Sequence, residues 1–311
     1  MSNDSAAAAD RICPSWFTAP TGVPHLPTLG AFHPGENVSC LLRDVFSAAE
    51  SGAVLPYDKD ARWFTSKRER IVPGVLTAED AAAGVVIPTV TDRRRLTLYC
   101  YGEPAEESIS ELAQTLGARY AAQSTHVVRL HPAVRERPGR GTRFWLHDFT
   151  APLPAEPAPV PGVYVLSECF GPLVLSFIDF AEQMREHGWG FLREQMRERD
   201  LGPILVRIHE GRVVGASGPL EIRPDSAGRA RLLPQYLGVL PDQRGQGFGR
   251  ELRRAVVAWA RRNGAQYELR QTEIDGVSDQ ISAEQGARCL GVQHRQVLVS
   301  GSTGGTACES V

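Results

Sequence analysis

The sequence predicts an α/β protein whose second half folds as a mixed sheet flanked by helices. From Gly162 onward, short apolar runs typical of strands alternate with longer segments of helical periodicity. In the middle of this half, an apolar strand run ends in a glycine-rich turn that opens a long helix. A proline-rich stretch over 151–161 separates this half from an N-terminal half of similar size, so it is predicted to be an interdomain linker.

The elements of the second half follow from these patterns in order. We expect a strand at 163–166, helices at 173–187 and 190–199, a hairpin of strands 204–209 and 212–222, a strand at 232–240, a helix at 244–263, a strand at 267–274, a helix near 278–288 and a last strand at 293–300. The hairpin turns at Glu210-Gly211, and Asn263-Gly264 supplies a helix stop.

The first half is less regular. Arg95 to Gly102 alternates like a strand, 105–123 has helical periodicity and 125–130 again resembles a strand. The predicted organisation is a disordered start (1–10), an N-terminal α/β domain (11–150), the linker (151–161), a second domain (162–300) and a disordered tail (301–311).

Composition limits the functional classes. Of 311 residues, 42% are hydrophobic and 23% charged, as in an ordinary globular protein, and the formal charge of -2 argues against a general nucleic-acid binder. The start lacks the basic and apolar regions of a signal peptide, and no stretch is apolar enough to span a bilayer, so we expect a cytoplasmic protein. Six scattered cysteines without a C-x-x-C pair, and histidines without ligand spacing, predict no disulfide framework and no bound metal.

The most informative segment is the run from Leu237 to Gly249, which has the form of a phosphate-binding loop. A strand ends at Pro241, and Gly245, Gly247 and Gly249 precede a helix. Glycine allows positive φ and close approach of a ligand, and the first N–H groups of a helix attract anions. In that helix an apolar stripe is formed by Phe248, Leu252, Ala255, Val256, Trp259 and Ala260, and the other positions carry Arg250, Arg253, Arg254, Arg261 and Arg262.

The sequence Arg244-Gly-Gln-Gly-Phe-Gly249 resembles the R-x-x-G-x-G signature of the GNAT superfamily of acyltransferases, with Val239, Pro241 and Leu252 also placed as in that family. The resemblance spans 162–300 and implies the GNAT fold, a mixed and mostly antiparallel sheet flanked by helices. It implies that the pantetheine arm of acetyl-CoA, or of another acyl-CoA, lies along Leu237, Gly238, Val239 and Leu240. It implies that the pyrophosphate is held by Arg244, Gly245, Gln246, Gly247, Phe248, Gly249 and Arg250. The two-half layout is similar to mycothiol synthase-type tandem GNAT proteins, which implies a degenerate GNAT-like N-terminal domain.

The catalytic groups that the resemblance implies are missing. The usual base position falls in Leu233-Pro-Gln-Tyr236, without a carboxylate, and Ala287 and Gln280 stand where the family has its tyrosine and asparagine. Glu273 and Asp275, at the end of the following strand, are the candidate bases, and alternation along that strand would put them on one face. Glu273 and Asp275 could instead both be solvated strand-end acids. Tyr236 and Gln235 could bind substrate or the oxyanion, and Tyr236 could equally be a core aromatic. Glu221 and His209 lie on the preceding strands.

Acceptor recognition is expected from the first two helices of the second half, which contain Phe177, Phe180, Met184, Trp189 and Phe191, most of them in the core. The leading hypothesis is an acyl-CoA-dependent N-acyltransferase, most simply an acetyltransferase, that acts on a small-molecule amine. One alternative takes the acyl or aminoacyl group from a carrier protein or a charged tRNA, met by the arginine-rich face of the helix. Another is a non-catalytic acyl-CoA-binding module. The oligomeric state stays open.

Overall fold

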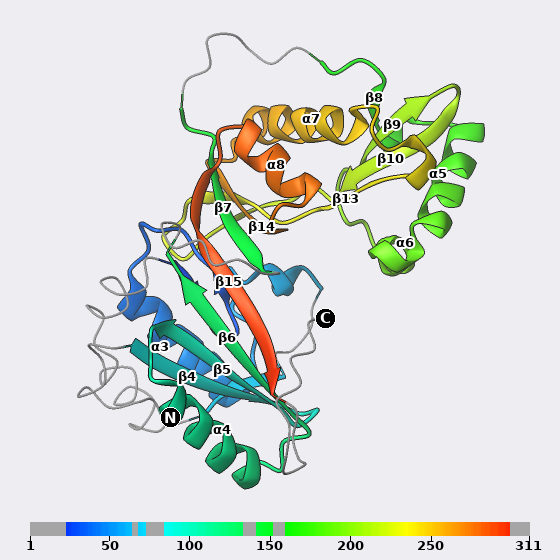
Figure 1. Cartoon of the computed structure of the whole chain (residues 1–311). Helices are drawn as coiled ribbons and strands as arrows, with labels where there is room; N and C mark the ends of the chain where they lie inside the picture. The colour runs from blue at the N-terminus through cyan, green and yellow to red at the C-terminus, as the bar shows by residue number, and fades with distance from the viewer. Residues whose placement is uncertain (1–22, 64–67, 73–83, 133–140, 152–158, 299–311) are drawn as a thin grey trace. The chain divides into compact units, whose positions relative to one another are not determined.

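The computed structural model describes residues 23–63, 68–72, 84–132, 141–151 and 159–298. The chain divides into two compact units, unit 1 comprising Met1–Leu146 and Leu269–Val311, and unit 2 comprising His147–Glu268 (Figure 1). The last part of the chain therefore belongs to the same unit as the N-terminal half. The predicted boundary at 161/162 lies inside unit 2. Positions 152–158 of the predicted linker and the two predicted disordered ends lie outside the described residues.

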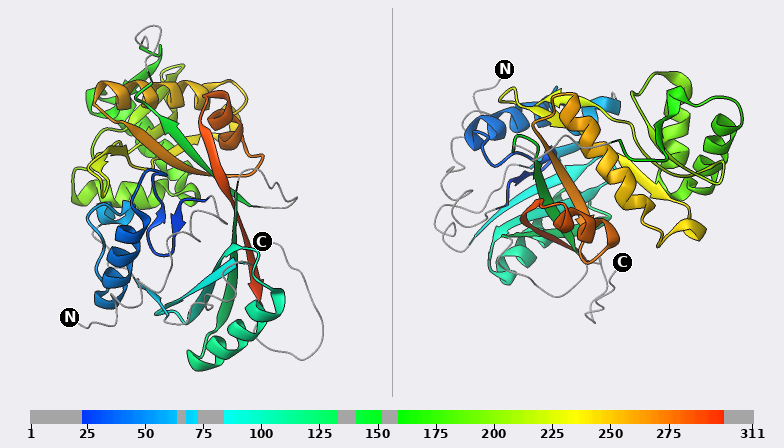
Figure 2. Two further views of the ribbon diagram at one scale, coloured as in Figure 1. Left: turned by 90° about the vertical axis from the view of Figure 1, so that its left-hand side faces the viewer. Right: turned by 90° about the horizontal axis from the view of Figure 1, so that it is seen from above.

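Unit 2 is built around an antiparallel four-stranded sheet with the order β13-β10-β9-β8. Its strands are β8 (Val163–Val165), β9 (Leu205–His209), β10 (Arg212–Gly218) and β13 (Tyr236–Val239), and its helices are α5 (Pro172–Gln183), α6 (Trp189–Glu198) and α7 (Phe248–Arg262). On one face Leu205 packs with Leu252 and Val256 of α7. On the other face α5 lies against β10 (Figure 2).

Two strands that the sequence predicts as continuous are each split. The run 212–222 breaks after β10 and resumes as β11 (Ile222–Pro224), and the run 232–240 divides into β12 (Ala230–Leu232) and β13. Strand β12 pairs in parallel with the start of β14 (Tyr267–Glu273), whereas β13 pairs with β10. Pro234 lies at the second break, where its missing N–H prevents a continuous ladder. The two parts of the run consequently belong to different sheets.

Unit 1 contains a sheet with the order β14-β7-β15-β6-β5-β4-β3, in which β14 supplies its residues from Leu269 onward. The other strands are β3 (Glu69–Ile71), β4 (Gly84–Thr91), β5 (Arg95–Gly102), β6 (Ser124–His131), β7 (Thr142–Asp148) and β15 (Arg288–Leu298), and a short hairpin joins β1 (His25–Leu26) to β2 (Gly30–Ala31). The prediction of β5 is confirmed to the residue. The last strand begins five residues earlier than the predicted start at 293, and it lies between β6 and β7.

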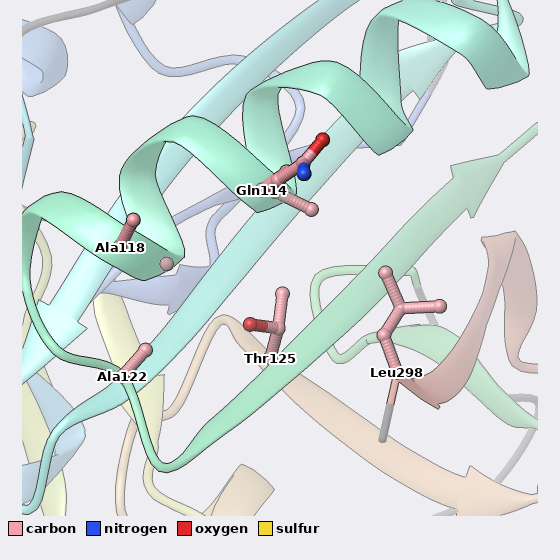
Figure 3. Close-up of a pocket in the computed structure, with 7 residues that line it drawn as sticks. Gln114, Ala118, Ala122, Thr125 and Leu298 are labelled. Carbon is pink, nitrogen blue, oxygen red and sulfur yellow. The ribbon is translucent and has the colours of Figure 1, made fainter. Parts of the chain in front are cut away.

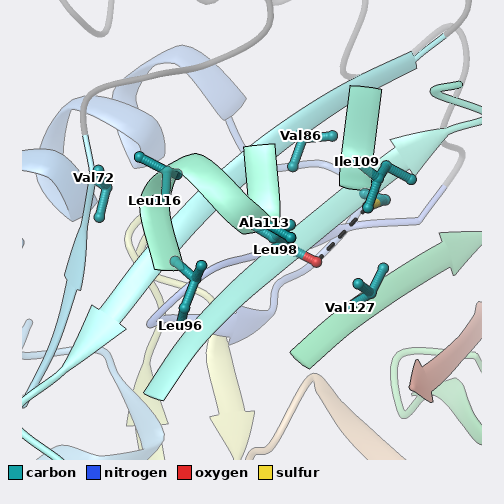
Figure 4. Packing of buried hydrophobic residues seen from close by; sticks show 9 residues of the cluster. Val72, Val86, Leu96, Leu98, Ile109, Ala113, Leu116 and Val127 are labelled. Atoms are coloured by element: carbon teal, nitrogen blue, oxygen red, sulfur yellow. Dashed lines mark hydrogen bonds between the residues drawn. The ribbon is translucent and has the colours of Figure 1, made fainter. Parts of the chain in front are cut away.

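Helices cover both faces of this sheet. Helix α4 (Glu106–Arg119) packs Ile109, Ala113 and Leu116 onto Leu98 and Val127 (Figure 4). Helix α3 (Val38–Ser51) lies on the opposite face (Figure 2), and the side chain of its N-cap Asn37 accepts a hydrogen bond from the backbone N–H of Cys40. A third helix, α8 (Val277–Glu284), precedes β15.

The predicted fold class, α/β with a mixed and mostly antiparallel sheet flanked by helices, is confirmed. No helix among the described residues is long and apolar enough to cross a membrane. Of the cysteines that the structure describes, Cys40, Cys100 and Cys169 are free thiols. Burial raises the pKa of the Cys100 thiol to about 12.

Candidate functional site

The loop before α7 adopts the glycine conformations that its sequence predicts. After a 3₁₀ turn at Pro241–Gln243, Gly245 has φ 81° and Gly247 has φ 86°. A Cβ atom built on either residue would meet no other atom within 4 Å, so the loop leaves open space next to its backbone. The left-handed residues also explain why α7 begins at Phe248 rather than at the predicted Arg244.

The first backbone N–H groups of α7 lie next to this loop. The first intrahelical bond runs from Glu251 N–H to the carbonyl of Gly247 (3.1 Å), so the N–H groups of Phe248 and Gly249 lie in the turn where a helix offers them no acceptor. The N-cap, Gly247, has no side chain that could accept from them. Arg244 and Arg250 beside this turn are exposed. The loop therefore combines N–H groups, the positive end of a helix and cationic side chains, which suits a diphosphate.

Strand β13 is an edge strand of its four-stranded sheet in the described chain. Leu240 N–H donates to Val214 O, and the register pairs Gly238 with Ala216. Because hydrogen-bonding direction alternates along an antiparallel strand, Leu237 and Val239 turn their backbone groups to the open edge. The Val239 carbonyl there accepts a hydrogen bond from Arg244 Nε (3.3 Å). An amide-containing chain could extend along this edge toward the loop, and the residues present thus fit coenzyme A.

Several contacts that the sequence did not reveal hold the loop in place. Phe248 is buried, with the guanidinium of Arg207 4.5 Å from its ring centre and the His209 ring 5.1 Å away. Arg207 Nε also pairs with Glu251 Oε2 at 2.5 Å. Hydrogen bonds from Gln243 and Arg212 hold the pKa of the Asp242 carboxyl below its ordinary value.

Tyr236 begins β13 on the face that α6 covers. Its ring lies so close to Gly188 that a Cβ there would come within 2.4 Å of the Tyr236 ring, and the centres of the Tyr236 and Trp189 rings are 6.3 Å apart. Phe177, Phe180, Met184 and Trp189 are buried, as the sequence predicts, whereas Phe191 is 44% exposed. The Trp189 indole N–H is also buried and donates no hydrogen bond within the described part of the chain.

The acidic candidates lie in unit 1, not in the unit that carries the loop. Glu273 is the last residue of β14, and Asp275 follows in a turn with φ 62°, so strand alternation does not extend to Asp275. The Asp275 N–H donates to Asp279 Oδ2 (3.1 Å). Asp279 is buried and also accepts from Trp145 Nε1, Thr272 Oγ1 and Arg143 Nη1, so this carboxylate fixes the turn.

The remaining sequence candidates have structural partners. Glu221 forms an ion pair with Arg223, and Gln235 Nε2 donates to the Leu233 carbonyl. His209 lies 3.9 Å from Glu210 Oε1. Ala287, at the expected acid position, precedes β15 and donates its N–H to the Ser282 carbonyl.

The prediction that Arg253 belongs to an exposed arginine face is wrong. Arg253 is 1% exposed and forms a bidentate ion pair with Glu268, which is fully buried. Arg261 donates to the carbonyls of Phe149 and Ala151, each at 2.8 Å. Arg250, Arg254 and Arg262 are the members of the group that are exposed, so the helix presents fewer exposed cations than its sequence indicates.

Unit 1 contains a hollow of about 310 Å³ beside the C-terminal half of α4 (Figure 3). It is lined by Ala113, Gln114, Gly117, Ala118, Ala122, Thr125 and Leu298, none of which titrates. Among the described residues, no group of three or more His, Cys, Asp or Glu side chains is arranged to hold a metal ion.

Comparisons with solved structures return several acetyltransferases at low sequence identity. Among solved structures, a GCN5-related N-acetyltransferase from Sphaerobacter thermophilus is 17% identical, covering 71% of this chain and 78% of that chain with a TM-score of 0.44. A GNAT-family acetyltransferase from Colwellia psychrerythraea is 15% identical (83% and 96% covered, TM-score 0.42). A tandem GNAT protein from the clavulanic acid biosynthesis pathway is 11% identical (84% and 94% covered, TM-score 0.45).

No curated protein matches the sequence. The model of the acetyltransferase (GNAT) family matches residues 172–277, from the first residue of α5 to the first residue of α8. The match contains the glycine loop, α7 and the edge strand β13, the parts whose geometry fits coenzyme A. Residues 172–277 of this chain therefore carry the sequence pattern of the GNAT acetyltransferase family.

Proposed function

We propose that the protein is an acyl-CoA-dependent N-acyltransferase that transfers an acyl group, most simply acetyl, to a small-molecule amine. The observation that carries the proposal is the joint presence of the open glycine loop at the start of α7 and the open edge of β13 within the family match. The backbone of Leu237 and Val239 would hold the pantetheine arm, and the loop from Arg244 to Arg250 the pyrophosphate. Bound acyl-CoA would supply a thioester carbonyl for attack by the amine.

The chain's own part in the reaction would be mainly to position the reactants. Holding a thioester next to an amine can supply about 7–11 kcal/mol of the barrier when the geometry is favourable. The amine must still lose a proton, and Glu273 and Asp275 are the proposed bases. Tyr236, half-buried at the start of β13, is proposed to contact the reacting groups. With Arg253 buried and paired, a carrier protein or tRNA as donor has less support.

The test is isothermal titration of the full-length protein with acetyl-CoA and with free CoA, using two variants of Gly249. A Cβ at Gly249 would lie 3.9 Å from Val239 Cγ2, an ordinary contact, so Gly249→Ala should fold and bind. Gly249→Asp places a carboxylate in the first helical turn, where it favours the helix but repels a diphosphate. At an effective dielectric of 20, two unit charges about 4 Å apart repel by about 4 kcal/mol, so affinity should fall at least 100-fold.

Wild-type protein that binds neither ligand, or a Gly249→Asp variant that binds as wild type does, would refute the proposed donor site. A parallel assay should follow thiol release from acetyl-CoA with a panel of small amines. Acetyl-CoA binding without turnover on any amine would favour the non-catalytic binding module.

A further inference from the structure

A row of basic side chains crosses the face of the unit 1 sheet opposite α4. Arg95 lies on β5, His126 on β6 and Arg295 on β15, which are neighbouring strands (Figure 1). The register pairs Thr97 with His126 and Val128 with Arg295. Paired residues share a face, as do residues two apart on a strand, so the three basic side chains project from the same side. Two inter-strand spacings add up to about 10 Å, and the register offsets Arg95 (opposite Ser124) from Arg295 (opposite Val128) by four residues, about 13 Å, along the strands. The two long arginine side chains can therefore reach one small ligand near His126 only by extending toward each other along this diagonal.

These side chains have unused hydrogen-bonding capacity. Arg95 Nε and His126 Nδ1 are buried, and neither has a hydrogen-bond partner within the described residues. In the same part of the chain, neither Arg95 nor Arg295 forms an ion pair. The opposite face offers a contrast, because Arg129 there donates to both carboxylate oxygens of Glu106 (2.8 and 2.6 Å). A buried donor without an acceptor is unfavourable, and the row lacks a carboxylate such as the one that Glu106 provides on the α4 face.

The charges around the row are predominantly positive. Burial lowers the pKa of His126, and repulsion from Arg295 and Arg95 lowers it further. One carboxylate on this face, Glu69, already accepts hydrogen bonds from Tyr99 Oη (3.1 Å) and Thr89 Oγ1 (2.6 Å), and Asp92, in the turn before β5, pairs with Arg70 (3.8 Å). The turn before β5 adds the exposed Arg93 and Arg94. An anion would be drawn to this face, and binding would relieve the repulsion within the row.

We propose that Arg95, His126 and Arg295 form a site for a small molecule carrying a phosphate or carboxylate group. Two guanidinium groups can each donate a pair of parallel hydrogen bonds to such an anion, and the imidazole adds another donor. The site lies in unit 1 and does not depend on the proposed acyl-donor loop of unit 2. A bound anion stabilises the imidazolium form of His126, so binding should strengthen as the pH falls through the pKa of this imidazole, which burial and the two arginines hold below its ordinary value in the free protein. Other titratable groups on this face are Tyr99, Glu69 and His25, whose ring stacks on that of Tyr99 with the centroids 5.7 Å apart, while Arg95 and Arg295 stay charged throughout.

The experiment uses full-length protein carrying Gly249→Asp, which removes the phosphate-binding capacity of the loop. Inorganic phosphate and succinate are titrated separately at constant ionic strength, by calorimetry and by the shift in melting temperature. Arg95→Gln and Arg295→Gln should each weaken binding at least tenfold. Arg93→Gln removes the same charge from the neighbouring turn and should leave affinity within twofold. Circular dichroism checks that each variant is folded.

The His126 ring is followed by NMR as a direct readout of the site. Its pKa should rise when the anion is bound and should not respond in Arg95→Gln. Binding of phosphate alone assigns a phosphate ligand, and binding of succinate alone assigns a carboxylate. Failure of both anions to bind, equal losses in Arg93→Gln, or a His126 pKa that ignores the anion would each overturn the proposal.

Discussion

The ion pair between Arg253 and Glu268 gives the sharpest test of how unit 2 is stabilised. Arg253, on α7, is 1% exposed, Glu268, on β14, is fully buried, and His147 Nδ1 lies 3.4 Å from Arg253 Nη2. Removing one partner leaves an uncompensated buried charge, which costs about 3–5 kcal/mol. Replacing both partners by apolar residues of similar size is often neutral or stabilising. We therefore expect Arg253→Met to be severely destabilised and Arg253→Met/Glu268→Leu to recover most of the loss.

The magnitude follows from the size of the unit. For a unit of this length, 1 kcal/mol shifts the melting temperature by about 3–5 °C, so the single variant should melt about 10–20 °C below wild type. Urea unfolding followed by tryptophan fluorescence gives the free energy directly. Arg254→Met, at the exposed neighbouring position, removes the same charge and should change stability by less than about 0.5 kcal/mol. A loss below 1 kcal/mol in Arg253→Met, or a double variant no better than the single, would refute this reasoning.

Three further outcomes are expected. In Gly238→Ala the new Cβ would lie 2.8 Å from Trp189 Nε1, so the variant should lose about 1–3 kcal/mol in urea unfolding, whereas Gly249→Ala should lose none. The exposed Cys40 should react with a thiol reagent at pH 8 within minutes. Cys100, whose pKa is raised to about 12 by burial, should react only after unfolding. Equal labelling rates of the two cysteines, measured by mass spectrometry, would contradict the burial of Cys100. Ending the chain at residue 285 removes β15 from between β6 and β7 and should abolish the cooperative unfolding of unit 1, while ending it at residue 300 should not.

The sequence predicts features that depend on neighbouring residues and misses those that depend on a distant partner. The loop could be predicted because Gly245 and Gly247 each need a left-handed conformation and an apolar strand and helix flank them. The burial of Arg253 could not be predicted, because helical periodicity separates polar from apolar residues but does not identify the acid with which a polar residue pairs. Its partner Glu268 lies on the next strand between Tyr267 and Leu269, and an acid flanked by two apolar residues is the signal that was available.

Long-range pairing was also hidden from sequence patterns. The proline-rich stretch suggested that everything after it forms one domain, but β15 pairs with β6 and β7, whose residues lie far earlier in the chain. Alternating apolar residues specify a strand without specifying its neighbours. The split of 230–240 into β12 and β13 could not be located either, although Pro234 marked where a ladder had to be interrupted.

The two units differ in the feature that makes a donor site possible. Both units contain a strand, a helix and a second strand that pairs in parallel with the first. In unit 1 these elements are β5, α4 and β6. In unit 2 they are the split strand β12–β13, helix α7 and the first residues of β14. In unit 1 the two strands pair along their full length, from Arg95 with Ser124 to Tyr101 with Leu130, and α4 opens with Glu106 and Glu107 rather than with glycines. A closed ladder offers no backbone groups to a pantetheine arm, and acidic residues in the first turn repel a pyrophosphate. Acyl-CoA binding is therefore expected at α7 alone in the described chain, which leaves unit 1 free to bind a different ligand.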